Sequence, residues 1–219
     1  MSNPEIEKHL IADIGDEVYV TLAKGGLNDL HCIVIPISHH ASMNHMTRAL
    51  SLKGEDYVTI SAAVKEMDSY ERRICKAFEK KGHLAVTFET FSGFLNGAGE
   101  RKLVHTHSQI VPISMQYAST LKARFIEEAL DDGLLPSENG EYPTDLNFPY
   151  IRVSFQDEFI VFVPSSGRMD YAFREYNDAI AQQQQNRRKA APPPLRVINP
   201  QFGRYLMIFI ISPLYTHTL

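Results

Sequence analysis

The sequence predicts an α+β fold in which an antiparallel sheet carries packed helices. Three observations lead to this prediction. Short segments with the apolar pattern of strands recur along the chain, helical segments with an apolar residue at every third or fourth position lie between them, and several neighbouring strands are separated only by short turns. Apolar residues make up 44% of the 219 positions, which is enough to bury one core with at most a small appended lobe.

The first half of the chain predicts three strands and one long helix. Residues 18–22 alternate apolar and polar side chains, and residues 31–37 form a more continuously apolar strand. Residues 56–81 repeat apolar side chains every three or four positions, which predicts a helix with one buried stripe. Gly82 ends that helix because glycine tolerates the left-handed cap, and residues 84–88 return as a strand.

The next part of the chain predicts a strand, a helix and a hairpin. The strand covers residues 104–113 and the helix covers residues 117–129. Residues 136–147 are polar and predict a linker. Residues 150–155 and 159–163 are rich in β-branched and aromatic side chains, so they predict a hairpin.

The C-terminal residues predict less regular structure. A helix over residues 171–185 would combine with the hairpin into a small C-terminal α/β extension. Residues 182–195 predict a flexible spacer, because its three consecutive prolines lack backbone donors and cannot continue a helix. Residues 205–219 form an atypical tail whose run of six apolar residues is too short to span a bilayer, so we expect no membrane contact.

Charge and cysteine content narrow the class of protein. The formal net charge is −4 at pH 7, so no general basic surface is expected to attract nucleic acid. RNA contacts would have to be local, at clusters such as Arg101-Lys102, although such clusters are more often plain solvated surface. Cys32 and Cys75 lie in an apolar strand and an amphipathic helix, which predicts reduced, buried thiols of an intracellular protein.

Two histidines and a glutamine alternate in the predicted strand 104–113. A strand projects alternate side chains to one face, so His105, His107 and Gln109 are expected in one row, about 6 to 7 Å apart. Burying this row would require hydrogen bonds, a metal or a ligand, whereas in a cleft the row could meet a phosphate. The alternative is a polar edge strand that merely faces water.

Together with a second segment, this row resembles the histidine-triad (HIT-like) superfamily in its glutamine-ending form. The second segment is the apolar strand 31–37 followed by His39, which completes a Pro-x-x-His pattern. The resemblance implies an HIT-like sheet, with His107 as a nucleophile that forms a phosphoramidate and Gln109 as a phosphate contact. It also implies that a backbone carbonyl fixes the His107 tautomer, and that His105, with Arg101 and Lys102, contributes to phosphate or RNA binding.

A closer resemblance is to the Cwf19-like (CwfJ C-terminal) family. The segments that carry it are residues 3–11, 14–27, 148–163 and 200–204. This resemblance implies a first block at residues 1–135 and a second block at residues 148–204. It further implies a nuclear protein, with the cytoplasm left open, that takes part in mRNA splicing and lariat turnover. The implied partners are branched intron RNA and splicing or debranching proteins, and a homodimer is left open.

The same resemblance leaves the metal and the chemistry undecided. Metal-containing relatives bind Zn²⁺ through a Cys-x-x-Cys pair and the positions of His39 and His105, and this sequence begins at Met1 where that pair is expected. We therefore expect Zn²⁺ only in a form with the pair, and otherwise no metal. Thr106 and Ser108 also replace apolar residues, and residues 99–104 lack a Gly-Gln-Ser-like loop. A non-catalytic accessory factor is thus favoured over an active nucleotide hydrolase or transferase, and a structural remnant is the third alternative.

Overall fold

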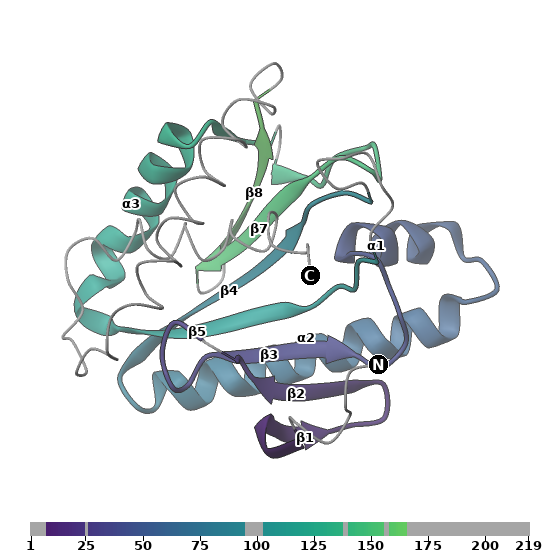
Figure 1. Ribbon diagram of the computed structural model, residues 1–219, viewed down its shortest axis with the longest axis horizontal. Coiled ribbons are helices and arrows are strands. Elements are labelled where there is room, and N and C mark those ends of the chain that lie inside the picture. Colours follow the sequence, from purple (N-terminus) through teal and green to yellow (C-terminus); the bar gives the residue numbers. More distant parts are fainter. Residues whose placement is uncertain (1–7, 25, 95–102, 138–139, 156–157, 166–219) are drawn as a thin grey trace, which may run out of the picture.

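The computed structural model describes residues 8–24, 26–94, 103–137, 140–155 and 158–165. These residues form one eight-stranded sheet with the strand order β1-β2-β3-β5-β4-β7-β8-β6, and every neighbouring pair of strands is antiparallel (Figure 1). Three α-helices accompany the sheet within the described residues. The predicted α+β class with an antiparallel sheet and packed helices is therefore confirmed.

The elements have the following bounds. The strands are β1 (Ile11–Ile14), β2 (Val18–Leu22), β3 (Cys32–Pro36), β4 (His83–Phe91), β5 (Ser108–Ser114), β6 (Leu134–Pro136), β7 (Tyr150–Phe155) and β8 (Glu158–Pro164). The α-helices are α1 (Met43–Leu52), α2 (Tyr57–Glu79) and α3 (Ala118–Asp131), and short 3-10 turns cover Lys8–Leu10 and Met115–Tyr117.

Most predicted elements agree with these bounds, and one needs correction. The strand predicted to begin at residue 104 begins instead at Ser108. The reason is that residues 104–107 have no ladder partner: pairing with β3 ends at Ser108 and pairing with β4 ends at Gln109. The polar stretch expected as a linker starts inside β6, which ends at Pro136.

The sequence analysis did not predict α1 or β1. The helix α1 is only ten residues long, and the side chain of its N-cap residue Ser42 accepts a hydrogen bond from the His45 backbone N–H at 3.3 Å. Its Met46 packs with Ile60 and Ala63 of α2, so tertiary contacts stabilise a helix too short to be marked by periodicity alone. The strand β1 is exposed along its whole length and lacks the alternation that identifies a half-buried strand.

The two faces of the sheet carry different helices. Alternate residues of β4 belong to two separate clusters, because successive side chains of a strand point to opposite faces. Ala85 packs with α2 together with Val18, Val34 and Ile110, whereas Val86 lies on the face that packs against α3. In Figure 1 the long helix α2 runs behind β2, β3 and β5.

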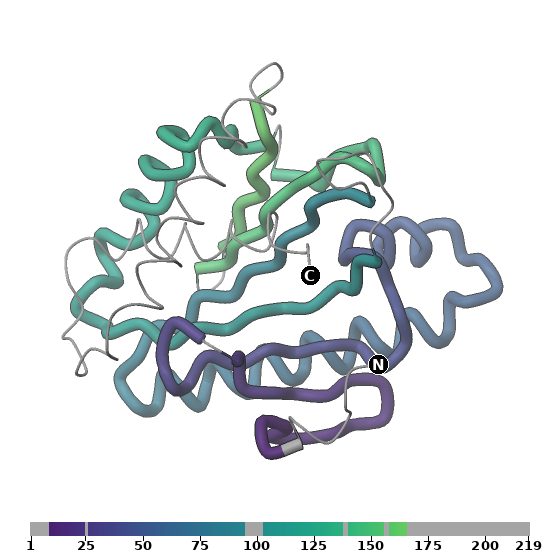
Figure 2. The backbone as a smooth tube through the Cα atoms, viewed as in Figure 1, coloured from purple at the N-terminus to yellow at the C-terminus, as the bar shows by residue number. Residues whose placement is uncertain are grey.

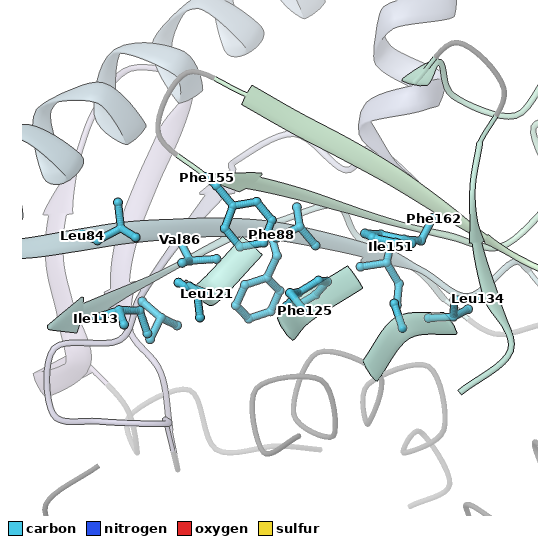
Figure 3. Close-up of a cluster of buried hydrophobic side chains, with 13 residues drawn as sticks. Leu84, Val86, Phe88, Ile113, Leu121, Phe125, Leu134, Ile151, Phe155 and Phe162 are labelled. Carbon is cyan, nitrogen blue, oxygen red and sulfur yellow. The ribbon is translucent and has the colours of Figure 1, made fainter. Parts of the chain in front are cut away.

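The helix α3 covers the other face at the β4-β7-β8 end. Figure 3 shows its Phe125 surrounded by side chains of the sheet, and the Phe125 ring lies 5.5 Å from the ring of Phe155 and 5.8 Å from that of Phe162. Over β2 and β3 this face carries no helix among the described residues (Figure 2), and Ile33 and Ile35 of β3 remain partly exposed there. Among the described residues, the β2-β3 end of the sheet therefore keeps an open face, the face opposite α2.

The predictions of reduced cysteines, of no membrane contact and of the C-terminal elements can also be compared with the structure. Both cysteines are free, as predicted, although each is partly rather than fully buried. Within the described part of the chain, no helix combines the length and the apolar character that a bilayer span needs. The predicted helix 171–185, the spacer 182–195 and the tail 205–219 lie outside the described residues.

Candidate functional site

Two histidine-bearing segments meet beside the open face of the sheet. One follows β3 and contains His39 and His40, and the other precedes β5 and contains His105 and His107. The Thr106 backbone N–H donates to the His40 carbonyl at 2.7 Å, and the rings of His39 and His105 lie 4.7 Å apart between centroids. The structure thus brings together residues whose pairing the sequence implied only through resemblance.

His107 and Gln109 contact each other at the start of β5. The Nδ1 atom of His107 lies 3.1 Å from the His105 carbonyl oxygen, which only accepts, so this ring nitrogen carries the proton. The Nε2 atom of His107 is then an acceptor, and the Gln109 side-chain nitrogen lies 3.4 Å from it. A backbone carbonyl therefore fixes the tautomer of His107, the arrangement that a reactive imidazole requires.

A further histidine, His31, lies beside Gln109. The Leu27 backbone N–H donates to His31 Nδ1 at 3.2 Å, so the neutral ring carries its proton on Nε2. The Gln109 side chain also lies near the His31 ring, where it raises the His31 pKa. The Gln109 amide nitrogen faces His107. The sequence analysis did not assign His31 to the site, although it stands at the start of the quoted Pro-x-x-His element.

Burial keeps His31 neutral. The residue is 1% exposed, and burial lowers its pKa to about 4; the hydrogen bond with Gln109 opposes this shift, whereas the nearby His107 adds to it. An uncharged imidazole accepts through one ring nitrogen, so the hydrogen bond from the Leu27 N–H to His31 Nδ1 does not change near neutral pH.

His39 and His105 supply only part of a zinc site. Burial lowers the pKa of His105, with a further contribution from His39, while backbone hydrogen bonds to Ser38 and Pro36 oppose the shift. The buried His105 Nε2 has no hydrogen-bond partner, as expected of a nitrogen that could coordinate a metal. However, the described residues contain no group of three or more His, Cys, Asp or Glu side chains that could hold a metal ion. Two imidazoles without further ligands do not fit zinc, and we assign it no role in the chemistry.

A buried carboxylate, Glu89, lies beneath the histidine segments. It is 2% exposed and accepts hydrogen bonds from the Met43 backbone N–H (2.7 Å), the Thr106 hydroxyl (2.7 Å) and the Tyr150 hydroxyl (3.0 Å). Burial raises the pKa of Glu89, whereas these three hydrogen bonds and its cross-strand neighbour Arg152 lower it. The sequence analysis missed Glu89; the available signal was one acidic residue in the otherwise apolar and uncharged β4.

The remaining predicted phosphate contacts cannot be placed beside this site. Arg101 and Lys102 lie outside the described residues. The described site therefore consists of His107 in contact with Gln109, His105 beside His39, and the nearby His31; the sequence-predicted row His105, His107 and Gln109 is called the outward row below.

Fold and site together define an α+β domain with a histidine-based polar site at the start of β5, an inner strand of the antiparallel sheet. Residues 1–126 match the family described as "Protein similar to CwfJ C-terminal", which is more than half of the chain. The chain belongs to this Cwf19-like (CwfJ C-terminal) family.

Some similar proteins are named CWF19-like, and another is named a zinc finger CCCH domain-containing protein. The chain is 32% identical over 136 residues to CWF19-like protein 1 of Xenopus laevis, a match that covers 61% of this chain and 21% of the relative. It is 26% identical over 176 residues to CWF19-like protein mug161 of Schizosaccharomyces pombe, covering 75% of this chain and 27% of the relative. It is also 32% identical over 125 residues to zinc finger CCCH domain-containing protein 59 of Oryza sativa subsp. japonica, a match that covers 57% of this chain and 17% of the relative. The matched region is thus a small part of each relative.

Proposed function

We propose that this chain is a splicing-associated Cwf19-like protein that binds branched intron RNA, with its His107–Gln109 site at a backbone phosphate. The observation that carries the proposal is the orientation of Gln109, whose amide nitrogen is turned toward His107 at 3.4 Å. An amide nitrogen has two N–H groups, so one can meet His107 while the other donates to a phosphoryl oxygen. The family assignment supports the choice of RNA as the phosphate-bearing partner.

The proposed role is that of an accessory factor in RNA turnover after splicing. Its partners would be the branched RNA and the splicing or debranching proteins that act on it, in the nucleus. Phosphate binding needs only donors and positive charge, whereas bond cleavage also needs an acid for the leaving group. The sequence before the histidines, residues 99–104, lacks the Gly-Gln-Ser-like loop of hydrolytic relatives, which favours binding over turnover.

Binding of matched RNAs tests this role. Fluorescence anisotropy would compare a branched RNA with a linear RNA of the same sequence over a salt series. We expect tighter binding of the branched RNA, a preference reduced at least fivefold in His107→Asn and Gln109→Ala, and no change in His9→Asn, which alters an exposed histidine in the short turn before β1. Equal affinity for both RNAs, decreasing only with salt, would leave nonspecific phosphate attraction and reject the proposal.

A second candidate function, nucleotidyl transfer, is favoured by the tautomer of His107. With its Nδ1 proton donated to the His105 carbonyl, Nε2 carries the lone pair that attacks phosphorus. The P–N bond to His107 would form as the bond from phosphorus to the leaving amine nitrogen or phosphate oxygen breaks, with solvent protonating the leaving group; water would later hydrolyse the phosphoramidate and restore the imidazole. Incubation with an adenylated amine or a dinucleoside polyphosphate, followed by mass spectrometry, would detect the His107 adduct. Absence of both adduct and product with intact His107 would exclude this function.

A further inference from the structure

Glu89 contacts three segments that lie far apart in the sequence. Its Oε1 atom accepts from the Met43 backbone N–H and from the Thr106 hydroxyl, both at 2.7 Å, and its Oε2 atom accepts from the Tyr150 hydroxyl at 3.0 Å. Met43 is the first residue of α1, Thr106 lies between the two histidines before β5, and Tyr150 begins β7. One carboxylate therefore connects the elements around the candidate site.

Thr106 determines how the second histidine segment is held. The described residues 103–107 belong to no β-ladder, so other contacts must fix their backbone. The Thr106 side chain is bound to Glu89, and its backbone N–H donates to the His40 carbonyl at 2.7 Å. Both contacts are buried or partly buried, and Thr106 itself is 3% exposed.

The peptide unit before Thr106 links this anchor to the tautomer of His107. In a trans peptide the C=O and N–H groups point in opposite directions. Because the Thr106 N–H is directed at His40, the His105 carbonyl of the same peptide unit is directed away from it, and there it accepts from His107 Nδ1 at 3.1 Å. Holding Thr106 in place therefore holds the group that orients the His107 ring.

The contact with Met43 fixes the other histidine segment. His39 and His40 are followed by Ala41 and the N-cap residue Ser42, so the start of α1 determines where they lie. A carboxylate at a helix N-terminus accepts from an otherwise unpaired N–H and interacts favourably with the helix dipole. Glu89 thus acts on both histidine segments at once.

We propose that Glu89, acting through Thr106 and Met43, is the positioning residue that sets the relative placement of the two histidine segments and so the orientation of the His107 ring. Glu89 does not itself contact the phosphate in this proposal; the role of the histidines as phosphate contacts rests on the proposed function. Tyr150 lies beyond residues 1–126, so part of this support comes from outside the region that matches the family.

Substitution of Thr106 separates positioning from general stability. Thr106→Val keeps the branched shape but removes the hydroxyl, and Thr106→Ser keeps the hydroxyl. The matched control is Ile113→Val, which loosens the buried core around α3 within β5, the strand that follows Thr106, without touching Glu89. Should Thr106→Val not fold, Thr106→Ala removes the hydroxyl without placing a methyl group beside the carboxylate.

The readout is the imidazole tautomer, measured on the free protein near pH 7.5 by long-range ¹H–¹⁵N correlation spectra. We expect a predominantly Nδ1-protonated His107 in the unsubstituted protein, in Thr106→Ser and in Ile113→Val. In Thr106→Val the Nδ1-protonated population should fall at least threefold, toward the mixture of a free imidazole. An unchanged tautomer in Thr106→Val, or an equal shift in Ile113→Val, would overturn the positioning role.

This measurement requires no ligand, so it separates the two proposals. A tautomer shift without any preference for branched RNA would reject the proposed function and retain the positioning role. If Thr106→Val keeps both the preference for branched RNA and the His107 tautomer, the positioning role is rejected and the proposed function is retained.

Discussion

Alternate residues between His105 and Gln109 have opposite surroundings. His105, His107 and Gln109 form the outward row, beside His39 and His31, and His107 remains only partly buried. The inward residues Thr106 and Ser108 are as buried as Gln109 and differ from the outward row in that each meets a carboxylate: Glu89 for Thr106 and Glu71 of α2 for Ser108. One row faces the site, and the other is joined to the interior.

The difference shows why hydroxyl residues occupy the inward row. Residues of the usual apolar type would add to the core but could not donate to Glu89 or Glu71. A buried carboxylate without donors would be strongly unfavourable, so the hydroxyl groups and the carboxylates require each other. The inward row therefore contributes to the placement of the outward row, and the two rows should respond differently to substitution.

The largest expected difference is between Glu89→Ala and His107→Asn. Glu89→Ala leaves three donors without their acceptor, and we expect the free energy of unfolding to fall by about 3 to 4 kcal/mol. Each buried unsatisfied group costs about one to three kcal/mol, and the variant recovers part of that cost because it no longer buries a carboxylate. His107→Asn alters a partly buried residue of the outward row and should change stability by about 0.5 kcal/mol or less.

Urea denaturation monitored by circular dichroism would measure both values. Glu89→Gln is the matched control, since it keeps an oxygen that can accept from Met43 and Thr106 and should lose less than Glu89→Ala. Equal losses in Glu89→Ala and His107→Asn would contradict the division between the two rows.

The elements with strong periodicity were predictable from the sequence, whereas short elements held by tertiary contacts were not. The apolar repeats of α2 and α3 and the alternation of β2 identified these elements to within about two residues at each end, which is the usual uncertainty of element boundaries. The helix α1 was missed because its stability depends on Met46 packing against α2. The start of β5 was placed too early because a pattern of side chains does not reveal whether a backbone has a ladder partner.

The same limit applies to the site. Alternation predicted that His105, His107 and Gln109 share one side; the side chains of His107 and Gln109 do contact each other, whereas the ring of His105, which precedes the strand, contacts His39. Glu89 could not be predicted, because its donors Met43 and Tyr150 lie 46 and 61 residues away in sequence and become its neighbours only through the sheet order. Thr106 and Ser108 were interpreted as departures from the usual pattern, since their partners are visible only in the folded chain.

A smaller effect is expected from the pH dependence of His31, which lies beside Gln109. In the unfolded chain this histidine ionises near pH 6.5, whereas in the folded protein burial lowers its pKa to about 4. Below pH 6.5 the unfolded state binds a proton that the folded state does not, so stability is present above that pH and is lost as the pH falls toward 4. Between pH 7 and pH 5 the loss should be about 2 kcal/mol.

The variant His31→Asn isolates this contribution, because its side-chain oxygen can still accept from the Leu27 N–H but cannot titrate. We expect the difference in stability between the two proteins, from urea denaturation at each pH, to shrink by about 2 kcal/mol between pH 7 and pH 5. A constant difference across this range would show that His31 is not held neutral in the folded protein.

The smallest effect is expected from Ser108→Ala in the inward row. Burial raises the pKa of Glu71, and the hydrogen bond from Ser108 together with the nearby Arg152 lowers it. Loss of the hydroxyl should therefore destabilise the ionised Glu71 and reduce stability at pH 7 by about 1 kcal/mol, the usual net value of one such bond. Because the hydroxyl acts on the ionised form, the loss should shrink as the pH falls and Glu71 takes up a proton in the folded state.

Ser114→Ala, at the far end of β5, is the matched control without a buried carboxylate. A loss in Ser108→Ala that is the same at pH 7 and at pH 4 would mean that Ser108 contributes packing alone, and that only Thr106 joins this segment to a buried charge.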